Sequence, residues 1–261
     1  MAIGKMITFT NLGAHGRLGN QLFQIASTIG IAIKNETDYL FPEWEASRYY
    51  KNPIPQVEVE ELLKLDLKLY NAVEHFHYKS VPLDKQYDWD IVGYLQSERY
   101  FQHCENIVRK HFCLRDECTM YLRSKYRDLL QSKCCSISVR RGDYLGLKEY
   151  HPVLTMDYYN RAITQFSEDT NFLIFSDGID WCKQSFNEER FFFIEESDPV
   201  LALHLISLCR NNIIANSSFS WWGAWLNEHQ NKKIIAPAIW FGEGLRHLDT
   251  RDLIPEGWIR M

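Results

Sequence analysis

Residues 134–144 read CCSISVRRGDY, a short apolar run that stops at two adjacent arginines. Such a run predicts a buried strand over 134–139. Downstream of it, predicted strands alternate with predicted helices: strands at 171–176, 191–195, 213–216 and 233–236, and helices at 157–168, 179–186, 200–209 and 217–228. Strict alternation of this kind predicts parallel βαβ units, in which ligands bind beyond the carboxyl ends of the strands.

The first half of the chain opens in the same way. A strand predicted at 6–9 runs through a glycine-containing loop into a helix predicted at 21–34. The pattern is looser after that, with helices predicted at 58–69 and 120–130 and a strand at 90–95. We therefore expect an α/β protein of two Rossmann-like halves, residues 1–132 and 133–261, with a ligand cleft between them.

The composition is that of an ordinary globular protein. Of the 261 residues, 46% are hydrophobic and 24% are charged, and the formal net charge of −5 argues against bulk polynucleotide binding. No apolar run approaches the roughly 20 residues that span a bilayer, and the first residues lack the apolar core of a signal peptide. The sequence predicts a cytoplasmic chain without a transmembrane segment, either free or peripherally associated with the inner face of the membrane.

The loop Gly16-Arg17-Leu18-Gly19-Asn20-Gln21 joins the first predicted strand to its helix. Glycines in this place let a backbone approach a phosphate, and the start of the helix offers free N–H groups. The loop does not match the dinucleotide fingerprint GxGxxG. A tight turn with a helix cap is therefore an equal alternative.

Arg140 and Arg141 directly follow the strand predicted at 134–139. A guanidinium fork suits a diphosphate, and side-chain alternation predicts that only one of the two points into the cleft. The alternative is that both arginines pair with carboxylates such as Asp143 and Asp177. Asp177 itself ends the next predicted strand, where it could accept hydrogen bonds from guanine or, alternatively, cap the helix that starts at Ile179.

Residues 216–225 read NSSFSWWGAW and carry an apolar strand straight into a helix that opens with serines. The hydroxyls of Ser217 and Ser218, the free N–H groups and the helix dipole together predict an anion site. Asn216 also begins a glycosylation sequon. We discount the sequon because nothing in the sequence routes the chain to a secretory compartment.

Together these segments resemble the bacterial and animal α-1,2-fucosyltransferases. The matching stretches, in family order, are GRLGNQLFQIA near the start, GYLQSERYF at 93–101, VRRGDY at 139–144, FLIFSDG at 172–178 and IIANSSFSWWGAWLN at 213–227. The resemblance covers nearly the whole chain. It implies a GT-B fold with residues 1–132 on the acceptor side and 133–261 binding GDP-fucose. It further implies inverting transfer of fucose to the 2-hydroxyl of a galactose in a glycan acceptor, in polysaccharide biosynthesis, with no metal or cofactor.

The resemblance also assigns roles to individual residues. It implies that Arg140 contacts the donor diphosphate, that Asp177 reads guanine and that the serine-rich helix start holds phosphate. The implied catalytic residues are Arg140, Asp143 and Asn20, and the implied substrate-binding residues are Gly19, Asn20, Arg140, Arg141, Asp177, Ser217, Ser218 and Phe219. Ser138 departs from the family motif HxRRxD, which begins with a histidine that helps hold the nucleotide.

Two metal-binding patterns were weighed against this assignment. Asp88-Trp89-Asp90 is a DxD triplet, with which many glycosyltransferases hold a divalent ion, but it has only two fixed residues and precedes a strand-like run instead of following one. The seven cysteines contain no CxxC pair, so we expect reduced, mostly buried thiols and no zinc site.

The sequence does not single out a general base. Asp143 is nearest to the arginines, and Glu149, His151 and His15 are further candidates. Two alternatives to the implied activity also stay open. One is a fucosyltransferase of different linkage, or one that uses another GDP-sugar. The other is a non-catalytic GDP-sugar-binding protein, which the Ser138 departure favours.

Overall fold

The apolar runs of the second half form the predicted strands. In this computed structural model, which describes residues 5–73 and 76–261, β7 (Cys134–Val139) and β8 (Asn171–Ser176) have the expected bounds. They join β9 (Phe191–Phe193), β10 (Asn211–Ile213), β11 (Ile234–Ala236) and β12 (Ile259–Arg260) in one parallel sheet of order β12-β11-β10-β7-β8-β9. The alternation in the sequence thus yields parallel βαβ units.

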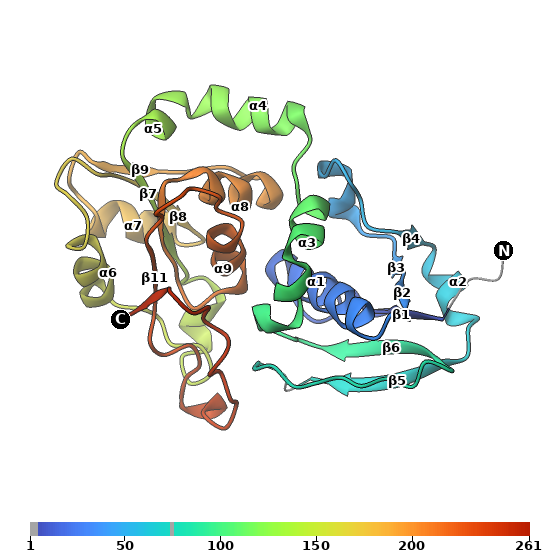
Figure 1. The fold of residues 1–261 in the computed structure, drawn as a ribbon. Coiled ribbons are helices and arrows are strands. Elements are labelled where there is room, and N and C mark those ends of the chain that lie inside the picture. The colour runs from blue at the N-terminus through green and yellow to red at the C-terminus, as the bar shows by residue number, and fades with distance from the viewer. Residues whose placement is uncertain (1–4, 74–75) are drawn as a thin grey trace. The chain divides into compact units, whose positions relative to one another are not determined.

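Helices cover both faces of this sheet (Figure 1). On one face, α6 (Met156–Ile163) and α7 (Ile179–Ser185) pack against a core that includes Cys135, Ile137 and Val139 of β7. On the other face lie α8 (Pro199–Leu208) and α9 (Ser218–Trp225). Asn212 of β10 donates to the carbonyl of Ile206 on α8 (2.9 Å).

The first half builds a smaller sheet of order β2-β1-β6-β5, also parallel. Its strands are β1 (Met6–Thr8), β2 (Asp38–Tyr39), β5 (Leu67–Ala72) and β6 (Asp88–Gly93), and β3 (Phe41–Pro42) pairs separately with β4 (Gln56–Val57). Its central helix is α1 (Leu18–Lys34), which is buried along most of its length. The other helices of this half are α2 (Val59–Leu63) and α3 (Glu105–His111).

The helix predicted at 58–69 is wrong in its second part. The chain leaves α2 at Leu63, and residues 67–72 form β5, which pairs with β6 along six successive residues from Leu67 with Asp88 to Ala72 with Gly93. The segment LKLDLKLY fits both a helical and an alternating pattern. Pairing with β6 decides between them, because a tertiary partner overrides a weak local preference.

The chain divides into two compact units. The first comprises Met1–Asp116 and Leu248–Pro255, and the second comprises Glu117–His247 and Glu256–Met261. The units thus change over at Asp116–Glu117, whereas the sequence placed the boundary at 132/133. Nearly all of α4 (Asp116–Lys125) and the whole of α5 (Arg127–Gln131) count with the second unit, where Lys125 donates to the carboxylate of Glu196 (2.8 Å).

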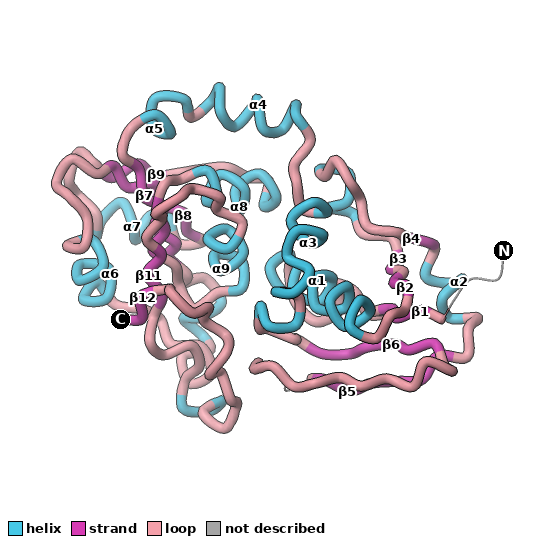
Figure 2. Tube along the Cα trace, viewed as in Figure 1, coloured by secondary structure: helices cyan, strands magenta, loops and turns pink. Residues whose placement is uncertain are grey.

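The last part of the chain belongs to both units. After β11 it is mostly loop (Figure 2). The segment Leu248–Pro255 joins the first unit, where the Asp252 carboxylate pairs with Arg99 (3.0 Å) and accepts from the backbone N–H of Tyr78 (3.2 Å). β12 then returns to the large sheet beside β11. Within 5–73 and 76–261, no helix combines the length and the apolar character that a membrane crossing requires.

Candidate active site

The strand order of the large sheet reverses between the neighbouring strands β7 and β10. From β7 the chain continues through β8 to β9 on one side, and from β10 through β11 to β12 on the other. The carboxyl ends of two such strands flank the crevice in which open parallel sheets bind ligands. Arg140 follows β7 and Ser217 precedes α9 after β10, so two predicted segments meet at this position.

The Arg140 guanidinium is held by two carboxylates and a ring. It donates to Asp143 Oδ1 (2.5 Å) and to Asp177 Oδ2, and it lies 5.1 Å from the ring centroid of Tyr144. Its side chain is 19% exposed. The carboxylate pairing that the sequence left as an alternative is therefore present for Arg140. It leaves the cation fixed in orientation and partly open to solvent.

Asp177 serves this arrangement and does not cap α7. Its Oδ1 accepts from the backbone N–H of Arg141 (2.8 Å), while its Oδ2 accepts from Arg140. The N-cap residue of α7 is Gly178, which makes no side-chain cap hydrogen bond. A Cβ atom on Gly142 would lie 2.5 Å from Asp177 Oδ2, so a larger residue at this position would displace the carboxylate that holds Arg140.

Arg141 points to a different side of the strand end from Arg140. Its guanidinium carbon lies 4.0 Å from the ring centroid of Trp181 on α7, a cation–π contact. The expectation that the two adjacent arginines diverge is thus met. Arg140 faces the carboxylate pair, and Arg141 faces the helix layer of α6 and α7.

Polar side chains stand at the start of α9, which follows β10, the neighbour of β7 in the sheet. Ser217 is the N-cap residue, and its side chain makes no cap hydrogen bond. Asn216 is 1% exposed, and its amide nitrogen donates to the carbonyls of Pro152 (3.0 Å) and Trp240 (3.1 Å). Asn216 therefore holds two loops together and is not accessible to glycosylation. Ser218 and Phe219 form the first turn of the helix and are half-buried.

Tyr144 and His151 complete this site, and the sequence gave them no assigned role beyond listing His151 as a possible base. Tyr144 donates to the Asn216 carbonyl (2.9 Å) and so links the β7 loop to the β10 loop. Burial raises the pKa of Tyr144 to about 12, which keeps this donor protonated. The His151 ring stacks on Tyr144 at 4.7 Å, and burial lowers the pKa of His151. The sequence feature that could have indicated a role for Tyr144 is its position four residues after Arg140, in the same loop.

Ser138, the departure from the family motif, lies at the end of β7. It is 6% exposed, and its hydroxyl has no hydrogen-bond partner among the described residues. Its carbonyl accepts from the Tyr159 hydroxyl (3.3 Å). The hydroxyl at this position is therefore buried and unpaired two residues before Arg140, and a serine side chain reaches less far than a histidine.

The remaining predicted residues, Gly19 and Asn20, lie in the first unit at the start of α1. Asn20 donates to the His15 carbonyl (3.2 Å) and accepts from the Gln96 side chain (3.0 Å). Gly16 has a φ of +108°, and a Cβ there would lie 2.1 Å from the Asn20 amide nitrogen. The loop is therefore a tight turn built around Asn20, with Arg17 as the N-cap residue of the helix.

Comparison with known proteins identifies the family. The sequence model of glycosyl transferase family 11 matches residues 3–259. This chain belongs to glycosyl transferase family 11.

Several curated members resemble this family 11 chain. The O-antigen biosynthesis glycosyltransferase WbnK of Escherichia coli is 29% identical over 81% of this chain, and an α-1,2-colitosyltransferase of Escherichia coli is 35% identical over 66% of it. A galactoside α-(1,2)-fucosyltransferase 2 of Oryctolagus cuniculus is 22% identical over 82%. The aligned part spans 68%, 62% and 66% of these relatives' own lengths, respectively.

Solved structures confirm the GT-B-like α/β fold of this family 11 chain. The fucosyltransferase NodZ from Bradyrhizobium superposes with a TM-score of 0.54 at 13% identity, covering 87% of this chain and 94% of NodZ. FUT1 of Arabidopsis thaliana, solved in complex with GDP, gives a TM-score of 0.57 at 12% identity, covering 89% of this chain and 70% of FUT1. Identities this low establish the fold alone.

Both carboxylates of the DxD triplet make hydrogen bonds within the smaller sheet. It lies inside β6, where Asp88 accepts from the Met6 backbone (2.9 Å) and Asp90 from the backbone N–H and the hydroxyl of Thr10. Both carboxylates thus tie β6 to the β1 segment. In the part of the chain that the structure describes, no group of three His, Cys, Asp or Glu side chains is arranged to hold a metal ion.

Proposed function

We propose that this chain transfers L-fucose from GDP-fucose to the 2-hydroxyl of a galactose in a glycan acceptor, with inversion and without a metal ion. The observation that carries the proposal is Arg140, oriented by Asp143 and Asp177 at the switch point between β7 and β10 and close to the start of α9. Doubly wound sheets bind nucleotides at this position. Membership of family 11 and the fucosyltransferase relatives support the choice of sugar.

The site supplies oriented hydrogen-bond donors for a leaving diphosphate. When the bond between the fucose C1 and the β-phosphate oxygen breaks, its electron pair leaves with GDP and negative charge grows on the phosphate. A fixed guanidinium and the N–H groups at the start of α9 stabilise that charge without reorganising. Asp177 and Asp143 keep Arg140 in place until the diphosphate takes over part of its hydrogen bonding.

The acceptor hydroxyl attacks C1 from the face opposite to the diphosphate, which inverts the configuration. Its proton passes to a base. We assign this role to Asp143, because at 45% exposure it is the more open of the two carboxylates that hold Arg140, compared with 28% for Asp177. Once the diphosphate engages Arg140, the Asp143 carboxylate is released for proton transfer. His151 is the second candidate, since it stacks on Tyr144 beside this site and burial lowers its pKa, which favours the neutral form.

GDP-colitose is a second candidate donor. One relative, 35% identical to this chain, is an α-1,2-colitosyltransferase. Colitose is fucose without its 3-hydroxyl, so the two GDP-sugars present the same diphosphate and differ in one hydrogen-bonding group. Discrimination between them depends on how the site treats that hydroxyl.

The test is a donor and acceptor screen with excess EDTA present. Purified protein is incubated with GDP-fucose or GDP-colitose and with β- or α-linked galactosides, and the linkage of the product is determined by NMR. We expect an α-1,2-linked fucosyl galactoside to form at undiminished rate in EDTA. Another linkage, or preference for GDP-colitose, would replace the proposed specificity. GDP binding with no turnover on any pair would make the chain a binding protein.

A further inference from the structure

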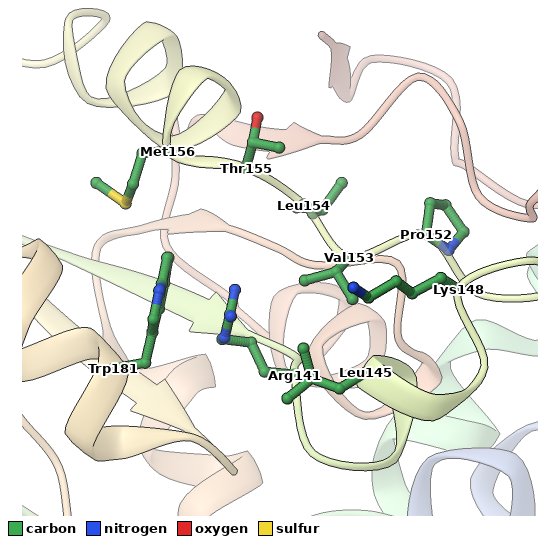
Figure 3. A pocket seen from close by; sticks show the side chains of 9 residues that line it. All are labelled: Arg141, Leu145, Lys148, Pro152, Val153, Leu154, Thr155, Met156 and Trp181. Atoms are coloured by element: carbon green, nitrogen blue, oxygen red, sulfur yellow. The ribbon is translucent and has the colours of Figure 1, made fainter.

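A second concave site lies on the α6 and α7 side of the large sheet (Figure 3). It is a pocket of about 510 Å³, within the size range of sites for small molecules. Its lining comes from the loop after β7, the segment before α6 and the first turn of α7: Arg141, Leu145, Lys148, Pro152, Val153, Leu154, Thr155, Met156 and Trp181.

The charge in this pocket is all of one sign. Arg141 and Lys148 are its charged lining residues, and the lining contains no carboxylate. Among the described residues, neither the Arg141 guanidinium nor the Lys148 ammonium group makes an ion pair or a hydrogen bond. The nearby carboxylates Asp143 and Asp177 are already engaged with Arg140, and Asp177 contacts Arg141 only through its backbone N–H.

The two cations are also oriented. Arg141 is stacked against Trp181 at 4.0 Å, and Gly178 lies so close to its side-chain stem that a Cβ there would be 3.3 Å from Arg141 Cβ. In Figure 3 the Lys148 side chain extends across the pocket toward Arg141. The ring of Trp181 backs one face of the guanidinium, so the rest of the guanidinium faces the pocket. A stacked guanidinium fork is well suited to a carboxylate or phosphate.

The remainder of the lining is apolar. Leu145, Val153, Leu154 and Met156 provide aliphatic surface around the two cations, and Thr155 adds one hydroxyl. Aliphatic surface of this kind packs against the C–H face of a sugar ring. A ligand that matches the whole pocket therefore has an apolar face and one anionic substituent.

We propose that this pocket binds an acidic sugar unit, one that carries a carboxylate or a phosphate, in the glycan acceptor. The inference rests on the proposed function, because it assigns the pocket to the acceptor. It is distinct from the donor site, since Arg141 and Arg140 point to different sides of the strand end. Arg140 is then left for the diphosphate of the donor, and Arg141 with Lys148 selects for acceptors with negative charge.

The test measures binding of three probes by titration calorimetry: glucuronic acid, glucose 6-phosphate and uncharged glucose. We expect at least one of the two charged probes to bind roughly tenfold or more tightly than glucose, as a charge-assisted contact predicts. Whichever of them binds better identifies the substituent as carboxylate or phosphate. Lys148→Gln should remove most of this preference. The matched control is Lys183→Gln on α7, an exposed lysine outside the pocket that pairs with Glu195.

Titration of GDP into the same proteins separates this inference from the proposed function. We expect Lys148→Gln to leave GDP affinity unchanged. Loss of GDP affinity in Lys148→Gln would place the pocket in the donor site and overturn the inference. Equal binding of all three probes, or a charged-probe preference that survives Lys148→Gln, would also overturn it. A wild-type protein that binds the acidic probe but not GDP would instead contradict the proposed donor.

Discussion

Arg140 combines features that are seldom found together in a surface arginine. It follows a buried strand, it is paired with two carboxylates, and it makes a cation–π contact with the half-buried Tyr144. Surface ion pairs of ordinary kind contribute little to stability. The convergence of three partners on one guanidinium at a switch point is instead what a preorganised charge-stabilising site requires.

Replacing Arg140 by alanine should lower kcat/KM by at least roughly 10²-fold, comparable to the loss of one preorganised donor at a site of developing charge. Arg140→Lys should recover only part of the rate, because the lysine ammonium lacks the bidentate fork. Steady-state kinetics of fucosyl transfer provide the measurement. Arg161→Ala on the exposed side of α6 is the control, with a side chain that is 57% exposed. Near-normal turnover in folded Arg140→Ala would remove Arg140 from the mechanism.

Asp177 was predicted to read guanine, and that remains a prediction, but the structure favours positioning of Arg140. Both of its oxygens are already hydrogen-bonded, to Arg140 and to the backbone N–H of Arg141. In Asp177→Asn the amide nitrogen would face the guanidinium as a second donor. We expect roughly tenfold weaker GDP binding from the misplaced arginine.

Comparison with inosine diphosphate separates the two roles of Asp177, since inosine lacks the 2-amino group of guanine. If Asp177 positions Arg140, Asp177→Asn should weaken GDP and inosine diphosphate by the same factor. A gap between the two nucleotides that closes in the mutant would show that Asp177 reads the base. Calorimetric titration of both nucleotides into both proteins gives the answer.

At the scale of elements, sequence patterns were most reliable where burial enforces them. β7 and β8 have their predicted bounds because each is a short apolar run closed by a polar residue, with Arg140 after one and Asp177 after the other. The helix predicted at 217–228 ends earlier, at Trp225. Asn227 is fully buried just beyond it, and its side chain donates to the Cys209 carbonyl (2.9 Å) and to Asn212 (2.8 Å). Such long-range partners cannot be recognised from local periodicity.

The candidate site was predictable to a similar extent. Residues that end strands were recognised, because strand ends of a parallel sheet meet at one edge. The supporting contacts of Tyr144 and Trp181 were not, because they depend on how loops fold back over the sheet. Nor does the sequence determine that Arg140 pairs with the carboxylates while Arg141 contacts the aromatic ring of Trp181.

The helix α8 makes stability sensitive to acid through His204. Burial lowers the pKa of His204 to about 3, whereas an unfolded histidine titrates near 6.5. The unfolded chain therefore binds a proton at a pH where the folded chain does not. Above about 6.5 the stabilisation is fully present, and it falls by up to about 1.4 kcal/mol per pH unit as the pH drops toward 3.

Chemical denaturation between pH 7 and pH 4 should reveal this dependence. We expect His204→Leu to flatten the fall in unfolding free energy below about pH 6.5. His247→Leu, at an exposed position of the same unit, serves as the control. If wild type and His204→Leu lose stability in parallel as the pH falls, the buried histidine is not the origin of the acid sensitivity.

On the scale of the whole molecule, the chain closes its first unit with residues from near its end. The side chain of Asp252 is 8% exposed and contacts Arg99 and the backbone of Tyr78, while its carbonyl accepts from the Ser97 hydroxyl (3.2 Å). Two units that share a terminal segment in this way are not separable by a single cut. A division at 132/133 would leave the first unit without Leu248–Pro255.

Asp252→Ala should therefore destabilise the first unit by about 1–3 kcal/mol, because it leaves the partly buried backbone N–H of Tyr78 and the Arg99 guanidinium without their acceptor. Hydrogen exchange followed by mass spectrometry should show faster exchange in peptides from α1 and β6, and little change in β7 and β8. Glu243→Ala, at an exposed position of the second unit, is the control. Uniform acceleration in both units would contradict the assignment of this segment to the first one.

We propose that the donor diphosphate binds between Arg140 and the start of α9 without a metal. The most direct measurement is a crystal structure of the protein with GDP, grown in EDTA. We expect phosphate oxygens within about 3.2 Å of the Arg140 guanidinium and of the N–H groups of Ser218 and Phe219. GDP seated instead in the pocket of Arg141 and Lys148, or bound only when a divalent ion is supplied, would contradict it.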